Sequence, residues 1–196
     1  MAPAQPPLFG VDVPDGFHYR PWFVSAPEEQ ALVDAIGAVE FASFEMRGVV
    51  ARRRVAFFGH SYDASLGDER PIPEFLRPLA SGFASWAGIA VDEFAMALIN
   101  EYRPGAPIGW HRDAPQYDIV AGLSLLSPCR MKFRRYVAPG AHARAGAPRR
   151  LATHEITLEP RSAYLMTGPA RNEYEHHIPE VAGLRYSITF RTLRQR

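Results

Sequence analysis

The chain from residue 94 onward is divided into short segments that alternate apolar and polar residues and are separated by Gly and Pro. Alternation of this kind is typical of strands that bury one face, and the breaks are typical of antiparallel turns. The expected strands are FAMALINEY (94–102), IVAGLSLL (119–126), RMKFRRYV (130–137), HEITLEP (154–160), RSAYLMTG (161–168) and RYSITFRTLR (185–194). The pattern predicts an antiparallel sandwich or barrel.

Two amphipathic helices are expected ahead of these strands. Residues 25–40 begin with Ser25 and carry Glu28 three positions on, which is a capping box, and their apolar residues recur at helical spacing. Residues 72–88 have the same spacing, with Pro78 near the helix start.

Length and composition favour one domain. A chain of 196 residues can bury one sizeable core. The Pro-rich residues 1–16 are expected to form a flexible lead-in, and residues 17–196 a single domain. Residues 138–150 are expected to be a mobile loop, because strands resume on both sides.

Composition also excludes several classes of protein. With 47% hydrophobic and 22% charged residues, the chain is neither disordered nor fibrous. No apolar run is long enough for a membrane span, and residues 1–10 lack the features of a signal peptide, so a cytoplasmic protein without membrane association is expected. Because Cys129 is the one cysteine, a bound metal would need histidine and carboxylate ligands.

Polar residues recur two positions apart in several of the expected strands, and residues an even number apart share a strand face. Taken alone, each such pair also fits a solvent-exposed strand or a turn. Together they suggest a polar cavity lined by Asn100 with Tyr102, His111 with Asp113, and Arg185 with Ser187, Thr189 and Arg191.

The His111-x-Asp113 pair can supply an imidazole nitrogen and a carboxylate oxygen to one metal ion. One further histidine, His176 or His177, would complete three ligands and leave the remaining positions open. This arrangement is associated with non-haem iron(II) oxygenases.

The ordered motifs NEY (100–102), PGAPIGWHRD (104–113), EHHIP (175–179) and RYSITFR (185–191) resemble the AlkB family of Fe(II)- and 2-oxoglutarate-dependent dioxygenases, over roughly residues 45 to 194. The resemblance implies an α+β, mainly β fold: a double-stranded β-helix, or jelly roll, with N-terminal helices and a substrate-binding lid. It also implies an enzyme that uses Fe(II), 2-oxoglutarate and O2.

The resemblance assigns roles residue by residue. It implies iron ligation by His111, Asp113 and His176, with His177 as the alternative for the third ligand. It implies 2-oxoglutarate binding by Asn100, Tyr102, Arg185, Ser187 and Arg191, with Asn in many members at the position of Ser187. Arg191 is expected to bind the distal carboxylate, and Arg185 to lie nearer the end that chelates iron.

The segment RRRVAFFGHSYD (52–63) resembles the lid strand of the family. The tryptophan that stacks on a flipped base in some repair members is not evident, so Phe57, Phe58 or His60 is expected to stack instead, although adjacent phenylalanines also fit a core. The expected substrate-binding residues are Arg52, Arg53, Arg54, Phe58, His60 and Tyr62.

Arginines also cluster at 130–135 and 144–150. Together with Arg52 to Arg54, the arginines at 130–135 are expected to hold phosphates, although solvated strand edges explain such clusters equally well. Repair members carry an acidic residue that helps to hold the damaged base at the position of Pro115, so Pro115 is a departure from the family pattern.

The implied function is oxidative demethylation of N-alkylated bases in DNA or RNA, as in alkylation damage repair, acting on single strands as a monomer. Two alternatives stay open. The first is hydroxylation of a modified transfer RNA base, a protein or a small molecule, since RRVAFFG and RSAYLMTGPAR are similar to the branch of the family that oxidises modified uridines. The second is a catalytically silent nucleic-acid-binding module.

Overall fold

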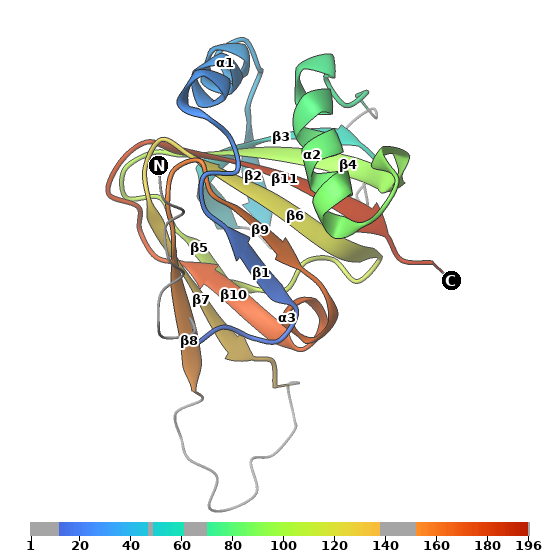
Figure 1. The fold of residues 1–196 in the computed structure, drawn as a ribbon. Coiled ribbons are helices and arrows are strands. Elements are labelled where there is room, and N and C mark those ends of the chain that lie inside the picture. Colours follow the sequence, from blue (N-terminus) through green and yellow to red (C-terminus); the bar gives the residue numbers. More distant parts are fainter. Residues whose placement is uncertain (1–11, 47–48, 61–69, 138–151, 196) are drawn as a thin grey trace, which may run out of the picture.

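The computed structural model describes residues 12–46, 49–60, 70–137 and 152–195. In these residues two antiparallel β-sheets face each other, and two helices cover the outer face of the larger sheet (Figure 1). The seven-stranded sheet has the order β1 (Phe17–Arg20), β9 (Ala163–Met166), β6 (Tyr117–Leu125), β11 (Arg185–Leu193), β4 (Phe94–Tyr102), β3 (Val49–Gly59) and β2 (Ala42–Met46). The four-stranded sheet has the order β5 (Ile108–His111), β10 (Tyr174–Ile178), β7 (Cys129–Arg135) and β8 (Thr153–Leu158).

The two long helices form where the sequence predicts them. Helix α1 (Ala26–Ile36) starts at the capping box, in which the Ser25 hydroxyl accepts from the Glu28 backbone N–H and the Glu28 carboxylate accepts from the Ser25 N–H. Helix α2 (Arg77–Ala87) follows a short 3-10 turn (Glu74–Leu76) and has Pro78 in its first turn. A second 3-10 turn (Val91–Glu93) leads into β4, and the short α3 (Gly168–Asn172) precedes β10.

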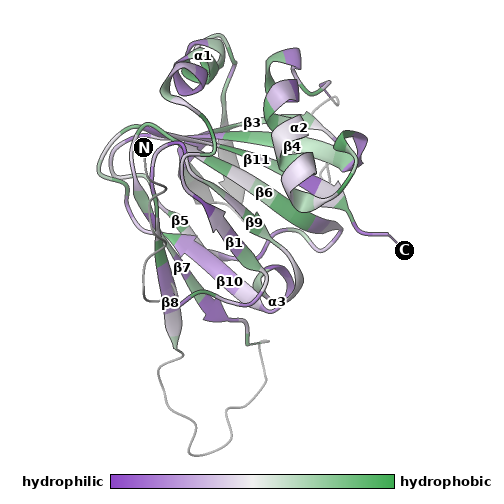
Figure 2. Cartoon of the chain, viewed as in Figure 1, coloured by the Kyte–Doolittle hydropathy of each residue, from purple (hydrophilic) through white to green (hydrophobic). Residues whose placement is uncertain are grey.

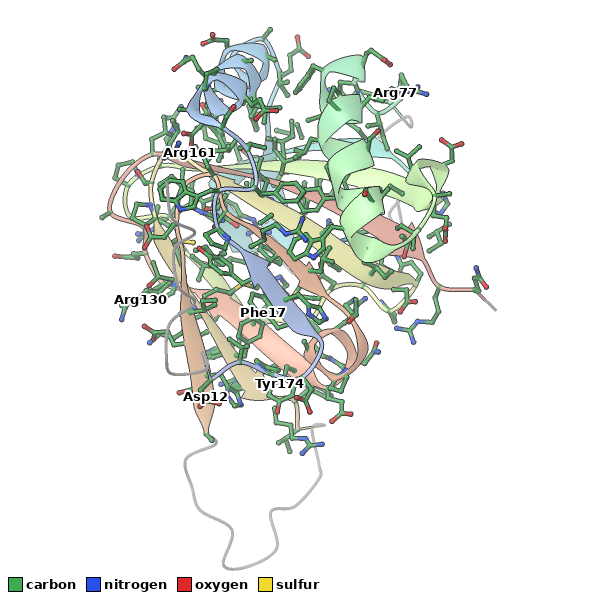
Figure 3. All side chains as sticks on the ribbon, in the orientation of Figure 1. Asp12, Phe17, Arg77, Arg130, Arg161 and Tyr174 are labelled. Carbon is green, nitrogen blue, oxygen red and sulfur yellow. The ribbon has the colours of Figure 1, made fainter. Side chains whose placement is uncertain are left out.

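Strand β4 of the large sheet sends alternate side chains into two different cores, and this parity positions the site. On β4, Ala97 and Ile99 pack under α1 and α2, whereas Met96 and Leu98 face the small sheet. Between the sheets, Phe17 packs against Phe133 from β7, with ring centroids 5.0 Å apart. Figure 3 labels Phe17 on β1. Figure 2 shows the strand β6 as largely hydrophobic and β10 as hydrophilic, and β10 carries the histidines considered below.

All six predicted strands are present, within two residues of the expected ends. The strands β1, β2, β5 and β10 were not expected, because each has at most five residues and little alternation. The described part of the lead-in also differs from the prediction: the carbonyls of Asp15 and Gly16 accept hydrogen bonds from Ala170 and Thr167, so residues 15 and 16 are held against the domain rather than free. The expected loop at 138–150 lies outside the described residues.

None of the helices in the described ranges is long and apolar enough to cross a membrane. The predicted fold class, a mainly β jelly roll preceded by helices, is confirmed by this arrangement and by the comparisons below.

Candidate active site

A cavity of about 110 Å³ lies between the two sheets, and Arg112 is the one exposed residue of its described lining, which marks the mouth of the cavity. Both sheets and the 112–117 segment contribute to its wall. The polar lining residues are Arg53, Asn100, Tyr102, His111, Arg112, Asp113, Tyr117, Tyr164, His176, Arg185, Ser187, Thr189 and Arg191. The three polar pairs predicted from strand parity therefore do line one cavity.

Strand register explains how the polar residues of the large sheet meet. Ser187 on β11 lies opposite Asn100 on β4 and Ser124 on β6, so three polar side chains form one row across the sheet. The Asn100 amide donates to the Ser187 hydroxyl at 3.4 Å. Arg185 lies opposite Tyr102, with its guanidinium 5.0 Å from the ring centroid.

The small sheet and the 112–117 segment bring His111, Asp113 and His176 together. His111 and His176 are direct partners in the β5–β10 pairing, and their ring centroids are 4.2 Å apart. His176 Nε2 lies 3.9 Å from Asp113 Oδ2. His111 Nδ1 lies 2.9 Å from the Gly109 carbonyl oxygen, which can only accept, so Nδ1 carries the proton and Nε2 keeps its lone pair.

The charge states of these three groups suit a metal ligand set. Burial, together with the neighbouring His111, lowers the pKa of His176 to about 3, and burial lowers the pKa of His111 as well, so both imidazoles are neutral. Burial by itself raises the pKa of Asp113, but the positive charge of Arg191, together with smaller contributions from other neighbouring groups, holds this pKa below its ordinary value. Two neutral imidazoles and one carboxylate are donors that iron(II) accepts.

Within the described residues, however, no three His, Cys, Asp or Glu side chains already stand in the arrangement of a bound metal ion. Asp113 is instead compensated by Arg191, whose Nη2 and Nε lie 2.6 and 3.0 Å from Oδ1. The second oxygen, Oδ2, faces His176. The chemistry of the donor set therefore fits a metal, while the carboxylate is oriented by an arginine.

The two arginines of β11 lie on opposite sides of Ser187 along the strand, in the reverse of the predicted positions. Arg191 was expected at the distal carboxylate, but it contacts Asp113 and Thr189. Arg185 was expected nearer the iron, but it lies at the other end, where Nε donates to Ser124 Oγ at 3.0 Å. Its side chain is 1% exposed, and Nη1 has no hydrogen-bond partner in the described structure. A buried donor without an acceptor is costly, so this end of the cavity fits a ligand carboxylate.

Strand parity separates the two adjacent histidines of β10. His176 faces the cavity, whereas His177 lies on the other face, where Nδ1 donates to the Ile108 carbonyl oxygen at 2.6 Å and the ring lies 5.1 Å from that of Trp110. The structure thus places His176, and not His177, with His111 and Asp113.

The same parity divides the lid strand β3. Arg53 and Phe57 line the cavity, and Arg53 Nε donates to Asn100 Oδ1 at 3.2 Å. Phe58 is wrong as a stacking residue, because it is buried in the core under the helices. Arg54 also faces away from the cavity, where it forms two hydrogen bonds with Glu101.

The remaining predicted substrate residues lie apart from the cavity or outside the described structure. Arg52 is exposed and pairs with Glu180 at 3.1 Å. His60 is exposed, does not line the cavity, and accepts a hydrogen bond from Tyr117 through its carbonyl. Tyr62 lies outside the described residues.

The arginine cluster at 130–135 is not a free basic surface. Arg130 and Lys132 pair with Glu155, Arg134 with Glu175, and Arg135 with Glu173. Arg130 extends away from the body of the protein (Figure 3). Each of these cations already pairs with a carboxylate on β8, on β10 or directly before β10, so the prediction that they bind phosphates is not supported. The cluster at 144–150 lies outside the described residues.

Besides Ser124 and Tyr117, sequence reasoning missed Tyr164, Arg171 and Arg112. Tyr164 lines the cavity, and burial raises the pKa of its hydroxyl, so it is a neutral donor; a side chain at Gly122 would collide with its ring. Buried Arg171 donates to the carbonyls of Ala114 and Tyr117 at 2.6 and 2.8 Å and so fixes the segment that follows Asp113. Arg112, at the cavity mouth, is considered below. Of Tyr164, Arg171 and Arg112, only Tyr164 could have been found from strand parity, since it lies in the predicted strand 161–168.

The cavity of this jelly roll brings together a His-x-Asp pair, a distant histidine and two arginines of the closing strand. This combination is typical of the non-haem iron(II) oxygenases that consume a 2-oxo acid. The model of the 2OG-Fe(II) oxygenase superfamily matches residues 21–191, and the chain belongs to this family. Fe(II), 2-oxoglutarate and O2 are therefore its cofactor and cosubstrates, and the chain is a dioxygenase.

The relatives support the more particular assignment to AlkB-like oxygenases. The "Alkylated DNA repair protein ALKBH8 homolog" of Arabidopsis thaliana is 28% identical over 184 residues, which cover 84% of this chain and 51% of that protein. The chain thus spans about half the length of this relative.

Two solved structures share the fold. OsALKBH1 matches with a TM-score of 0.64 and 13% sequence identity, and the match covers 92% of this chain and 99% of the OsALKBH1 chain. A Pseudomonas putida prolyl-4-hydroxylase has a TM-score of 0.61 at 14% identity, covering 92% and 94%. The predicted resemblance to AlkB-like Fe(II)/2-oxoglutarate dioxygenases is confirmed.

Proposed function

We propose that this chain oxidatively demethylates N-alkylated bases of single-stranded DNA or RNA. The observation that carries the proposal is one cavity lined by the donors His111, Asp113 and His176. The same cavity is lined by two arginines of β11 and by Arg53 and Phe57 of the lid strand. The name of the Arabidopsis relative, an alkylated DNA repair protein, supports this class of substrate.

In this proposal, His111, Asp113 and His176 hold Fe(II), which supplies the oxidising chemistry together with O2 and the 2-oxo acid. Arg191 keeps Asp113 ionised and turned toward His176, and the Gly109 carbonyl fixes the tautomer of His111. These contacts orient the donors before the metal binds.

The distal carboxylate of 2-oxoglutarate is assigned to Arg185, helped by Ser124 and the neutral hydroxyl of Tyr164. The support is the buried Nη1 that lacks an acceptor and the Ser124 contact that holds the guanidinium in place. Asn100 and Ser187 line the cavity between this end and the metal end, and Tyr102 lies opposite Arg185.

The reaction balances as follows. O2 oxidises 2-oxoglutarate to succinate and CO2, and one oxygen atom enters a C–H bond of the N-methyl group. The resulting N–CH2–OH group breaks at its C–N bond, giving formaldehyde and the unalkylated base. Because the base must leave its stack to reach the cavity, single strands are the expected substrate.

The lining of the cavity favours an uncharged base. Arg53 and Arg112 line the cavity. Pro115 stands where repair members of the family carry an acidic residue that helps to hold the damaged base. Bases such as 1-methyladenine and 3-methylcytosine carry a positive charge, whereas 3-methyluracil is neutral and offers carbonyl acceptors to Arg53. We therefore expect 3-methyluracil to be preferred.

The test measures succinate and formaldehyde together, after anaerobic loading with Fe(II) and 2-oxoglutarate and exposure to O2 with single-stranded RNA bearing 3-methyluracil or 1-methyladenine. Equal amounts of both products, lost in His111→Ala, are expected, and Arg53→Glu should shift the preference toward 1-methyladenine. Succinate coupled to substrate oxidation without formaldehyde would contradict demethylation.

That outcome would favour the second candidate function, stable hydroxylation of a modified transfer RNA base. The same observation supports it, since a uridine-like base is neutral and suits Arg53. The silent binding module is disfavoured, because both arginines and all three donors are retained in one cavity. We further expect a cytoplasmic monomer.

A further inference from the structure

Arg112 and Tyr136 form a cation–π pair at the mouth of the active-site cavity. Arg112 lies in the chain between His111 and Asp113, is exposed, and lines the cavity. Its guanidinium carbon is 3.6 Å from the centroid of the Tyr136 ring. This contact is the shortest of its kind in the described structure, and it holds a flexible side chain in one place.

The backbone around the pair is also fixed. Tyr136 follows β7 directly, and its backbone N–H donates to the Glu173 carbonyl at 2.8 Å. Arg112 Nη1 lies 3.4 Å from the carbonyl oxygen of Asn172, which ends α3. The pair is therefore anchored between the 112–117 segment, the end of β7 and α3.

Arg112 differs electrostatically from the arginines of β7. Arg134 and Arg135 each face a glutamate, whereas Arg112 has no ion pair with a carboxylate among the described residues. Two carboxylates next in the chain to Arg112 or to its contact Asn172 are engaged elsewhere, since Glu173 pairs with Arg135 and Asp113 with Arg191. A cation at the mouth of the cavity thus lacks the neutralising partner that the paired arginines have.

We propose that Arg112, held flat against Tyr136, binds a backbone phosphate of the nucleic acid strand next to the base that enters the cavity. A guanidinium presents parallel N–H donors that match phosphate oxygens, and stacking on one face leaves its edge available. The proposal rests on the proposed function, because it names how the strand is held at the same site.

The test uses the full chain and an unmodified, fluorescein-labelled single-stranded RNA, with affinity measured by anisotropy between about 50 and about 200 mM salt. Each phosphate contact to a single strand contributes about 0.7 to the slope of log affinity against log salt. Arg112→Gln should lower the affinity and reduce the slope by about that amount, while Arg112→Lys, which keeps the charge, should retain the slope.

Arg135→Gln is the matched control, because Arg135 is an exposed arginine nearby that already pairs with Glu173. It should leave the slope unchanged. Tyr136→Leu should weaken binding while keeping the slope, since it loosens the guanidinium but leaves its charge. Melting temperatures of all variants show that each is folded.

An unchanged slope in Arg112→Gln, or an equal loss in Arg135→Gln, would overturn the proposal while leaving the proposed function intact. A labelled acidic peptide that shows the same Arg112-dependent slope, with no such effect for RNA, would overturn it in favour of a protein substrate. If the wild-type chain binds RNA without any salt dependence and does not oxidise it, the proposed function itself fails.

Discussion

Arg191 and Asp113 form an ion pair inside the cavity, with Arg191 Nη2 2.6 Å from Asp113 Oδ1 and both side chains at least nine-tenths buried. The pair joins the closing strand β11 to the segment after β5. Through it, the arginine nearest the proposed metal site sets the orientation of a proposed ligand.

Removing one member of this pair should destabilise the protein, because the other is left as an uncompensated buried charge. Arg191→Met should lower the free energy of unfolding by about 3–5 kcal/mol in metal-free protein, and Arg191→Met with Asp113→Asn should recover part of the loss. Urea denaturation of the single and double variants measures this. A double variant that shows the plain sum of the two single effects would refute the coupling.

The two histidines of β10 should differ in metal binding. His176→Ala should lose bound Fe(II), or Mn(II) as a redox-silent probe, with an affinity drop greater than the roughly 10–100-fold typical of residues that only orient a ligand. His177→Ala should bind metal as the wild type does, because His177 lies on the opposite face of the strand. Metal titration at equilibrium makes the comparison, and equal losses in both variants would show that the third ligand is misassigned.

Arg185 should determine the affinity for 2-oxoglutarate. A hydrogen bond to a charged group contributes about 1.5–3 kcal/mol, so Arg185→Gln should raise the KM for 2-oxoglutarate by about 10-fold to 150-fold. Ser124→Ala, which removes the contact to Arg185 Nε, should also raise the KM for 2-oxoglutarate, but by a smaller factor. Succinate formation at varied 2-oxoglutarate concentration gives the KM of both variants. An unchanged KM in Arg185→Gln would indicate that Arg191, and not Arg185, binds the distal carboxylate.

Glu101 should make stability depend on pH. Burial alone would raise its pKa, but hydrogen bonds from Arg54 and Arg103 outweigh burial and hold the pKa of Glu101 below its ordinary value. A carboxyl group with a lowered pKa in the folded state stabilises above its unfolded pKa, and this contribution is lost as pH falls through the folded value.

Glu101→Gln should therefore lower the free energy of unfolding by about 1–3 kcal/mol at neutral pH. The difference from wild type should shrink below about pH 4, near the ordinary pKa of glutamate. Glu180→Gln is the control, because its exposed pair with Arg52 should contribute less than about 1 kcal/mol at any pH. A Glu101→Gln deficit that stays constant as the pH falls would exclude this linkage.

The sequence predicts most of the fold and most of the candidate site, because strand parity is a local property. Strand parity and the family resemblance predicted the strands of the second half of the chain and the polar pairs that face the cavity. The contacts that could not be predicted depend on the pairing of strands that are distant in the sequence. Ser124 joins Ser187 only through the β6–β11 register, and Arg134 meets Glu175 only because β7 pairs with β10. The roles of Arg185 and Arg191 likewise depend on where the 112–117 segment crosses β11, which no local pattern encodes.

Phe57 and Phe58 lie on opposite faces of β3, so substitutions at the two positions test which face of this strand meets the substrate. Phe58 lies in the core under the helices, so Phe58→Ala should lower the free energy of unfolding by about 3–5 kcal/mol. Phe57 lines the cavity, so Phe57→Ala should change stability much less and instead weaken binding of the target base. Base–aromatic stacking contributes about 1–3 kcal/mol, which corresponds to a rise of about 5-fold to 150-fold in the KM for RNA bearing 3-methyluracil. Urea denaturation and steady-state kinetics on both variants measure the two effects. If Phe58→Ala raises this KM while Phe57→Ala leaves it unchanged, the face of β3 that meets the substrate is the opposite one.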